Sequence, residues 1–397
     1  MTTTEQGAPT PTAPTPTAPT PTAPAPTGRA AGWHRLRVAR VRPLTDDAVA
    51  LTLDLPDVPD QSADAGDAGD AGDDADAFVH RPGQHVTVRH VLNGTEIRRS
   101  YSICPPPSAP RELRLVVKRL GPGGFGEYAT TVLAAGDTLD VGPPTGGFGL
   151  VAQPGAHHVM VAAGSGITPL LSMATAALRD DPGCRVSLIY TNRTARSVLL
   201  ADELADLKDA YVDRFLPLYL LTRETREAEL LSGHVDTARL PGLLRAVGAE
   251  PDGDAYFYLC GPWGMVTSVR EALTGWGADP ARTHAELFSL GPQDPPPPAA
   301  ELRGRTVRIT ASLGGRTAVA VMEEQDRTAL DALLRVRPDT PYSCREGLCG
   351  SCRARVTRGT VTTGRQHVLG PAELAAGYTL ACRARPESDD TALDFDL

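Results

Sequence analysis

The chain has 397 residues, enough for two or three domains of ordinary size. Its formal net charge of -9 leaves no strongly basic surface, which argues against nucleic acid as a partner. No apolar run approaches the roughly 20 residues of a membrane span, and the N-terminus lacks the pattern of a secretory signal. We therefore expect a cytoplasmic, reducing location, where the seven cysteines serve as metal ligands or free thiols.

The N-terminal part of the chain divides into a tail and a β-rich segment. Residues 1–32 are rich in Thr, Pro and Ala with almost no large apolar side chain, so we expect a disordered tail. Short strands punctuated by Gly and Pro over 33–152 are typical of a small antiparallel β-barrel. An Asp/Ala/Gly repeat at 57–77 predicts a solvated, disordered insert, because like charges repel and Gly resists ordering. The alternative is a Ca²⁺ loop, which is disfavoured because the spacing fits no EF-hand pattern.

The C-terminal part predicts two further domains. Strand and helix patterns alternate over 153–290, which indicates an α/β domain with a parallel sheet. Residues 291–302 contain four consecutive prolines and predict a stiff, extended linker. The last segment, 303–397, predicts a single small domain. The chain as a whole is therefore predicted to be multidomain.

Four cysteines in this last segment carry the strongest signal in the chain. Cys344, Cys349 and Cys352 have the spacing C-x4-C-x2-C, and Cys382 follows after a long gap. This is the plant-type pattern for a [2Fe–2S] cluster. The alternative is a structural zinc site, which usually pairs its ligands in two short units, whereas the chain contains one such unit.

Two motifs in the β-rich segment suggest a flavin site. Arg99 can clamp a phosphate, Tyr101 can cover an isoalloxazine ring, and Ser102 can hydrogen-bond a ring nitrogen. Alternation along a strand places Arg99 and Tyr101 on one face. Downstream, a glycine-rich turn precedes a short predicted helix and contains Gly123, Gly124 and Gly126. Such a turn is a phosphate site by geometry, and an ordinary turn is the alternative.

Three strand ends in the α/β segment suggest a nicotinamide nucleotide site. A buried-type strand runs into a turn and helix start that contains Gly164, Gly166 and Thr168, where a pyrophosphate can approach a helix N-terminus. The second strand ends at Asn192 and Arg193; an arginine there suits a 2′-phosphate and favours NADPH over NADH. The third ends at Cys260, Gly261 and Pro262 on the same sheet edge. Cys260 is predicted to touch the nicotinamide, with a free buried cysteine as the alternative.

Taken in order, these motifs resemble the ferredoxin–NADP⁺ reductase family fused to a plant-type ferredoxin, the arrangement of oxygenase reductases. The resemblance covers residues 33 to 397 and includes the segment at 286–288. Three local segments, 82–85, 98–104 and 189–194, resemble the reductase subunits of phenylacetyl-CoA epoxidases. The fold implied is an antiparallel β-barrel flavin domain, an α/β nucleotide domain and an α+β ferredoxin domain of the β-grasp type.

The resemblance also implies cofactors and roles. Tyr101, Ser102, Cys260 and Glu286 would lie at the contact between flavin and nicotinamide, and Gly126 replaces a serine common in the family. The full glycine turn favours FAD over FMN. Because NADPH gives up two electrons together and a cluster accepts one at a time, a flavin must stand between them. The chain would then feed an oxygenase component, such as the diiron phenylacetyl-CoA epoxidase. The alternatives are a Rieske dioxygenase, a demethylase or another monooxygenase as acceptor, and a non-enzymatic redox sensor.

Overall fold

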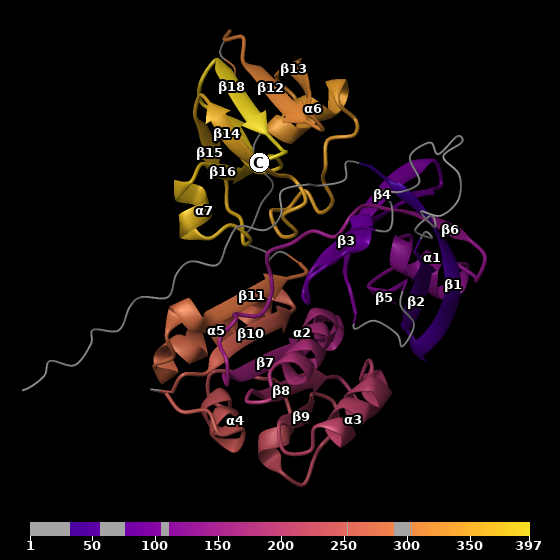
Figure 1. The fold of residues 1–397 in the computed structure, drawn as a ribbon, viewed down its shortest axis with the longest axis vertical. Helices are drawn as coiled ribbons and strands as arrows, with labels where there is room; N and C mark the ends of the chain where they lie inside the picture. Colours follow the sequence, from indigo (N-terminus) through magenta and orange to yellow (C-terminus); the bar gives the residue numbers. More distant parts are fainter. Residues whose placement is uncertain (1–31, 56–75, 105–110, 252, 290–301, 303) are drawn as a thin grey trace, which may run out of the picture.

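The computed structural model describes residues 32–55, 76–104, 111–251, 253–289, 302 and 304–397. The expected tail, insert and linker lie almost wholly outside these ranges. Asp76 and Ala77, at the end of the expected insert, belong to the 3-10 helix η1 (Asp76–Phe78). The described residues form three domains, which Figure 1 separates by colour along the chain, and this confirms the predicted multidomain fold.

The first domain is the predicted antiparallel barrel. Its six strands lie in the order β4-β3-β6-β1-β2-β5, and a bridge between Ile103 and Leu115 joins the two ends of the sheet. Alternate side chains such as Leu51 and Leu53 fill the interior, which explains the period-two pattern of the sequence. The elements are β1 (His34–Thr45), β2 (Ala48–Asp54), β3 (His85–Leu92), β4 (Thr95–Ser102), β5 (Glu112–Lys118), α1 (Phe125–Thr131) and β6 (Thr138–Val141).

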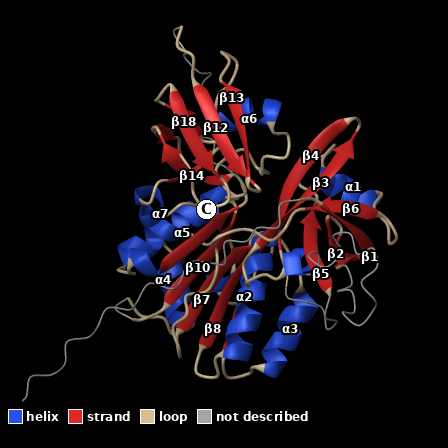
Figure 2. Ribbon diagram, turned by 45° about the horizontal axis from the view of Figure 1, so that its top comes forward, coloured by secondary structure: helices blue, strands red, loops and turns tan. Residues whose placement is uncertain are grey.

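The second domain is the predicted parallel sheet, with the order β11-β10-β7-β8-β9. Its strands are β7 (His157–Ala163), β8 (Arg185–Asn192), β9 (Phe215–Leu221), β10 (Tyr256–Gly261) and β11 (Thr283–Leu287). The helices are α2 (Ile167–Asp180), α3 (Ala201–Ala210), α4 (Leu240–Ala246) and α5 (Trp263–Trp276), with 3-10 turns η2 (Gly164–Gly166), η3 (Ala195–Ser197), η4 (Glu229–Leu231) and η5 (Pro280–Arg282). Helices α2 and α3 cover one face and α4 and α5 the other (Figure 2). The strand order reverses at β7, and such a switch point opens a crevice for ligands.

Strand β9 and helix α4 have no counterpart in the sequence expectations. Pro217 lies inside β9, and a proline within an apolar run argues against a strand because it cannot donate to a sheet ladder. In the structure β9 lies at the edge of the sheet. One side of an edge strand has no neighbouring strand, so the missing N–H of Pro217 need not cost a sheet hydrogen bond.

The third domain is a mixed sheet with the order β13-β12-β18-β14-β16, crossed by α6, as expected for a β-grasp. Its elements are β12 (Arg308–Leu313), β13 (Arg316–Val321), α6 (Ala329–Val336), β14 (Arg353–Arg358), β15 (Val361–Thr363), α7 (Pro371–Ala375), β16 (Tyr378–Leu380), β17 (Ala384–Pro386) and β18 (Asp390–Asp394). Strands β12 and β18 are parallel, and the other neighbours in this sheet are antiparallel.

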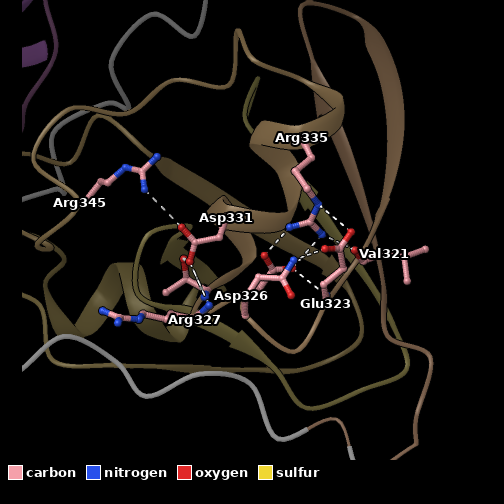
Figure 3. Close-up of polar contacts among 9 residues, drawn as sticks. Val321, Glu323, Asp326, Arg327, Asp331, Arg335 and Arg345 are labelled. Carbon is pink, nitrogen blue, oxygen red and sulfur yellow. Dashed lines mark hydrogen bonds and ion pairs between the residues drawn. The ribbon is translucent and has the colours of Figure 1, made fainter. Parts of the chain in front are cut away.

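Charged side chains fix α6 in this third domain (Figure 3). Arg335 donates to the Val321 carbonyl at 2.7 Å and to Asp326, and lies 3.2 Å from Glu323. At the other end of the helix, Asp331 accepts the Thr328 N–H at 3.0 Å and closes a capping box.

The domains contact one another through polar groups as well as apolar ones. Glu203 on α3 accepts from Arg42 of the barrel at 2.5 Å and also from Arg114. Ser100 of β4 donates to Ser343 of the third domain at 2.9 Å. Among the helices in the described ranges, none is long and apolar enough to cross a membrane.

Candidate functional site

A cavity of about 530 Å³ lies where the three domains meet. The barrel contributes most of the wall, including strand β4 and the glycine turn before α1. The second domain contributes the start of α2 and the end of β11, and the third contributes the loop that carries the cysteines. Its principal polar and glycine lining residues are His85, Arg99, Tyr101, Ser102, Gly124, Gly126, Ser165, Thr168, Glu286, Ser343, Cys344, Glu346 and Cys349.

Strand β4 brings the three residues predicted to hold flavin to this cavity. Arg99 and Tyr101 project from it two residues apart, and Ser102 ends the strand. The Tyr101 ring packs against Phe125 with 5.7 Å between ring centroids, and burial raises the pKa of its hydroxyl. The exposed Arg99 donates to the Arg98 carbonyl at 2.9 Å and lines the cavity.

Each glycine in the turn before α1 occupies its position for a different physical reason. Gly123 has φ +73°, a left-handed conformation, and its N–H donates to the Glu127 carboxylate at 2.6 Å. The turn therefore already presents an amide to an anionic oxygen. Gly124 caps α1, and a Cβ at Gly126 would lie 2.7 Å from the Lys118 carbonyl oxygen. Gly126 thus allows α1 to approach β5, a reason for glycine that the sequence analysis did not identify.

Glu286 is the buried acid of the cavity. It lies at the end of β11 in register with Cys260, and Ser102 hydrogen-bonds its carboxylate. Burial, with a smaller contribution from Cys349, raises the pKa of Glu286 to about 8. Its Oε1 lies 3.9 Å from His85 Nδ1 and its Oε2 has no hydrogen-bond partner within the described structure. An orphaned polar oxygen that lines a cavity fits a site that a polar ligand completes.

The predicted nucleotide residues gather at the carboxyl edge of the parallel sheet. Gly164 follows β7 with φ +52°, and a Cβ at Gly166 would lie 2.1 Å from the Cys260 carbonyl oxygen. Thr168 closes the turn by donating to the Ser165 carbonyl at 2.9 Å, and both side chains line the cavity. The tight turn therefore lets the start of α2 pack against β10.

The other two strand ends place their residues differently. Asn192 is buried at the end of β8, whereas Arg193 is exposed beside it. Gly261 ends β10, and Pro262 caps α5. Cys260 is fully buried and is not among the cavity-lining residues, and its thiol pKa is raised by burial and by Glu286. This geometry matches the alternative of a free buried cysteine.

The four predicted ligand cysteines form two thiol pairs. Cys344 lies beside Cys349, and Cys352 lies beside Cys382. No three metal-ligating side chains of the described residues converge as they would on a single ion. Two pairs of thiols, however, are the donor set of a cluster with two irons. The residues therefore fit a [2Fe–2S] group better than a single zinc ion.

The loop around these cysteines suits a buried sulfur site. The N–H groups of Glu346 and Leu348 donate to Cys344 Sγ at 3.3 and 3.4 Å. Gly347 and Gly350 have φ values of +76° and +73°, which bend the loop inward. Backbone amides aimed at sulfur are a means by which a protein tunes a cluster.

Several cavity residues were not predicted as site residues, among them His85, Glu346 and Leu348. His85 starts β3, and Glu346 and Leu348 lie between the first two cluster cysteines. Leu348 packs into the core of the second domain. An apolar residue in an otherwise polar, glycine-containing loop was a usable signal of such a contact. His85 lay in the segment 82–85 that carried the family resemblance, but no role in the site was assigned to it.

Three protein-family models match the chain in the order of its domains. They are an oxidoreductase FAD-binding domain at 73–149, an oxidoreductase NAD-binding domain at 160–271 and a 2Fe-2S iron-sulfur cluster binding domain at 313–387.

Relatives with curated names share this organisation. The chain is 36% identical over 368 residues to one of the subunits of 1,2-phenylacetyl-CoA epoxidase from Escherichia coli (strain K12), and the match covers 92% of this chain and 98% of the relative. It is 32% identical over 329 residues to the 3-ketosteroid-9-alpha-monooxygenase ferredoxin reductase component of Rhodococcus rhodochrous, covering 81% of this chain and 89% of the relative.

A solved structure supports the fold over the same length. Phthalate dioxygenase reductase superposes with a TM-score of 0.52 at 23% identity and covers 92% of this chain and 98% of its own. Together with the sequence relatives, these matches identify the chain as an electron-transfer oxidoreductase. It belongs to the family of oxygenase reductase components that join an FAD-binding, an NAD-binding and a 2Fe-2S cluster binding domain.

Proposed function

We propose that this protein passes electrons from NADPH through FAD and a [2Fe–2S] cluster to an oxygenase component. One observation carries the proposal: Tyr101 and Ser102 of the predicted flavin site line the same cavity as Ser165 and Thr168 of the nucleotide turn, and as the cluster ligand Cys344. A hydride donor, a flavin and a one-electron acceptor can therefore meet in one place. Family membership favours this enzyme over a redox sensor.

The predicted site residues would bind different parts of the cofactors. Arg99, Gly123 and Gly124 would hold the flavin phosphates, Tyr101 and Ser102 its ring, and the four cysteines the cluster. Bound flavin supplies the exchange between a two-electron donor and a one-electron acceptor. The chain's task is to align the groups and keep water out. Because its pKa is about 8, Glu286 is mostly protonated at neutral pH and keeps its proton at the carboxyl beside Ser102. Glu286 and Cys260 would flank the nicotinamide contact, Cys260 through its backbone.

We assign NADPH rather than NADH as the donor. The exposed Arg193 follows β8, and the backbone N–H of the exposed Arg223 donates to its carbonyl at 2.8 Å, so two arginines lie at the strand end where a 2′-phosphate would be expected to bind. The carboxylate of Glu224 nearby is engaged by the Ala195 N–H at 3.0 Å. Arg193→Ala should narrow the preference for NADPH over NADH by about tenfold, as expected for a lost phosphate contact. Arg179→Ala, on the surface at the end of α2, is the matched control. An unchanged preference would mean that the 2′-phosphate binds elsewhere.

We further propose the diiron phenylacetyl-CoA epoxidase as the acceptor, in the cytoplasm. The support is the near full-length similarity to a subunit of such an epoxidase, and the seven cysteines, all free in the structure, suit a reducing compartment. The similarity to 3-ketosteroid monooxygenase and glycine betaine monooxygenase reductases keeps another oxygenase as the second candidate. Reconstitution with each purified oxygenase would separate them: substrate-dependent NADPH oxidation with one acceptor alone identifies the partner.

The first test is an anaerobic titration of the purified holoprotein with NADPH, followed by absorbance and by low-temperature EPR. Flavin bleaching together with a [2Fe–2S] EPR signal is the expected result. Bleaching without that signal would contradict the transfer to the cluster, and no reaction at all would contradict the proposed function. Chromatography of the extracted flavin checks FAD, and FMN alone would overturn that assignment.

A further inference from the structure

Strand β4 borders both the flavin cavity and the third domain. Arg99, Ser100 and Tyr101 line the cavity, and Arg98 and Ser100 contact the domain that carries the cysteines. Arg98 is only 6% exposed, although arginine is rarely buried without a specific partner. We propose that Arg98 and Tyr342 form a docking contact that positions the cluster loop against the flavin cavity and so governs electron transfer from flavin to cluster. This inference rests on the function proposed above.

The guanidinium of Arg98 is held between aromatic rings of two domains. Its central carbon lies 3.9 Å from the Tyr342 ring centroid and 5.0 Å from that of Trp33. Its Nε donates to Glu96 at 2.8 Å and its Nη2 to the Pro338 carbonyl at 3.4 Å. A planar cation desolvated between rings makes a stronger and more directional contact than an exposed ion pair.

Tyr342 connects this contact to the cluster loop. It lies two residues before Cys344, and its ring also faces the Arg345 guanidinium at 4.7 Å. Arg345 has φ +58°, a strained conformation for a residue with a side chain, and it donates to Asp331 of α6 at 3.4 Å (Figure 3). A displacement of Tyr342 would therefore move the loop on which Cys344 stands.

The loop has further attachments besides the Arg98–Tyr342 contact. Leu348 packs into the core of the nucleotide domain, and Ser343 accepts a hydrogen bond from Ser100 at 2.9 Å. Arg98 and Tyr342 themselves line a cleft of about 470 Å³ between the two domains, together with Trp33, Pro338 and Arg345 among others. The Arg98–Tyr342 contact therefore spans the cleft on this side of the loop. Arg98 does not line the flavin cavity, so it acts as a positioning residue rather than a catalytic one.

The test uses four variants of the holoprotein: Arg98→Ala, Tyr342→Ala, Tyr342→Phe and the control Arg37→Ala. Arg37 is an exposed barrel arginine paired with Asp54, away from the contact. Rapid anaerobic mixing with NADPH follows flavin bleaching by absorbance and cluster reduction by freeze-quench EPR. Hydrogen exchange over 96–102 and 338–351 reports the docking itself without turnover.

We expect flavin bleaching to stay within about twofold of wild type, and cluster reduction to slow by at least about tenfold in Arg98→Ala and Tyr342→Ala, the effect of a misplaced acceptor. Exchange should rise in both segments of these variants, while Tyr342→Phe, which keeps the ring, and Arg37→Ala should behave as wild type. Cluster reduction within twofold of wild type in both alanine variants, or equal loss in Tyr342→Phe, overturns the inference. If NADPH fails to bleach the wild-type flavin, the proposed donor is refuted. The flavin is then reduced by light instead, and the comparison of cluster reduction among the variants still tests the docking contact.

Discussion

His157, at the start of β7, shows how burial alone sets the behaviour of a single residue. The ring is 4% exposed and its Nε2 lies 2.9 Å from Ser187 Oγ. Burial, followed by the nearby Arg185 and His158, lowers the pKa of His157 to about 4, against an ordinary value of 6.5. The imidazole therefore stays neutral in the folded protein at a pH where it would be charged in the unfolded chain.

This shift predicts a pH-dependent stability. Between pH 6.5 and 4 the unfolded chain binds a proton at His157 that the folded protein does not, so the free energy of unfolding should fall as the pH is lowered through that window. The loss amounts to about 3 kcal/mol at most. In His157→Gln this contribution disappears, so urea unfolding of both proteins at pH 4 to 7 should show a difference that changes across the window. A constant difference would contradict the prediction.

Ser102 provides a second residue-level prediction, because it joins the cavity wall to Glu286. Ser102→Ala removes the hydroxyl that hydrogen-bonds the carboxylate and leaves a buried acid without that partner. We expect flavin reduction by NADPH to slow on the order of tenfold, the value of one such hydrogen bond. Stopped-flow absorbance measures the rate, and Ser102→Thr, which keeps a hydroxyl, should retain most of it. An unchanged rate in the alanine variant would remove Ser102 from the set of contact residues.

At the scale of elements, the turn between β7 and α2 contains two glycines that are required for different reasons. Gly164 has φ +52° and a Cβ added there would meet no other atom within 4 Å, whereas a Cβ on Gly166 would meet the Cys260 backbone. Gly164→Ala should cost about 1–2 kcal/mol for the left-handed conformation alone. Gly166→Ala must push the start of α2 away from β10 and should cost more, since overpacking of backbone has no easy relief. Chemical unfolding of the two variants compares them, and equal effects would refute the distinction.

Elements also show where sequence patterns succeeded and failed. The strands with clean alternation or buried runs, and the helices that follow them, were predictable because their periodicity reflects one exposed and one buried face. Strand β9 was not, since the sequence does not say that Pro217 would stand at a sheet edge. The glycine at 126 was assigned to a phosphate contact by analogy, while its closest neighbour is the Lys118 carbonyl of β5.

At the scale of the whole molecule, the charge of the third domain bears on its partner. Residues 303–397 contain 14 arginines and 12 acidic residues, a formal charge of +2. Several of these charges neutralise each other, as in the contacts of Arg335 and Asp326. Free ferredoxins often rely on strongly charged faces for steering, and this domain has no such excess. Tethering supplies a high local concentration for the internal step instead.

We therefore expect coupled turnover with the oxygenase to depend weakly on ionic strength. Between roughly 50 and 300 mM salt the rate should change by less than about twofold, because no large opposing fields are screened. Steady-state oxidation of NADPH in the presence of the oxygenase measures this, with flavin bleaching alone as the salt control. A steep fall in the coupled rate with no change in bleaching would show that electrostatic steering matters.

The sequence by itself determined the multidomain fold, and it predicted the four cysteines as cluster ligands and the residue types of the flavin and nucleotide sites. These features depend on local spacing, periodicity and turn chemistry, which the chain order carries directly. Only the tertiary structure decided that β4, the β7 turn and the cysteine loop border one cavity, that Cys260 is buried away from it, and that His85 and Glu346 belong to it. It alone also placed Arg98 against Tyr342, 244 residues later. Such contacts join side chains far apart in the sequence, and packing between domains leaves no periodic trace in the residues that make it.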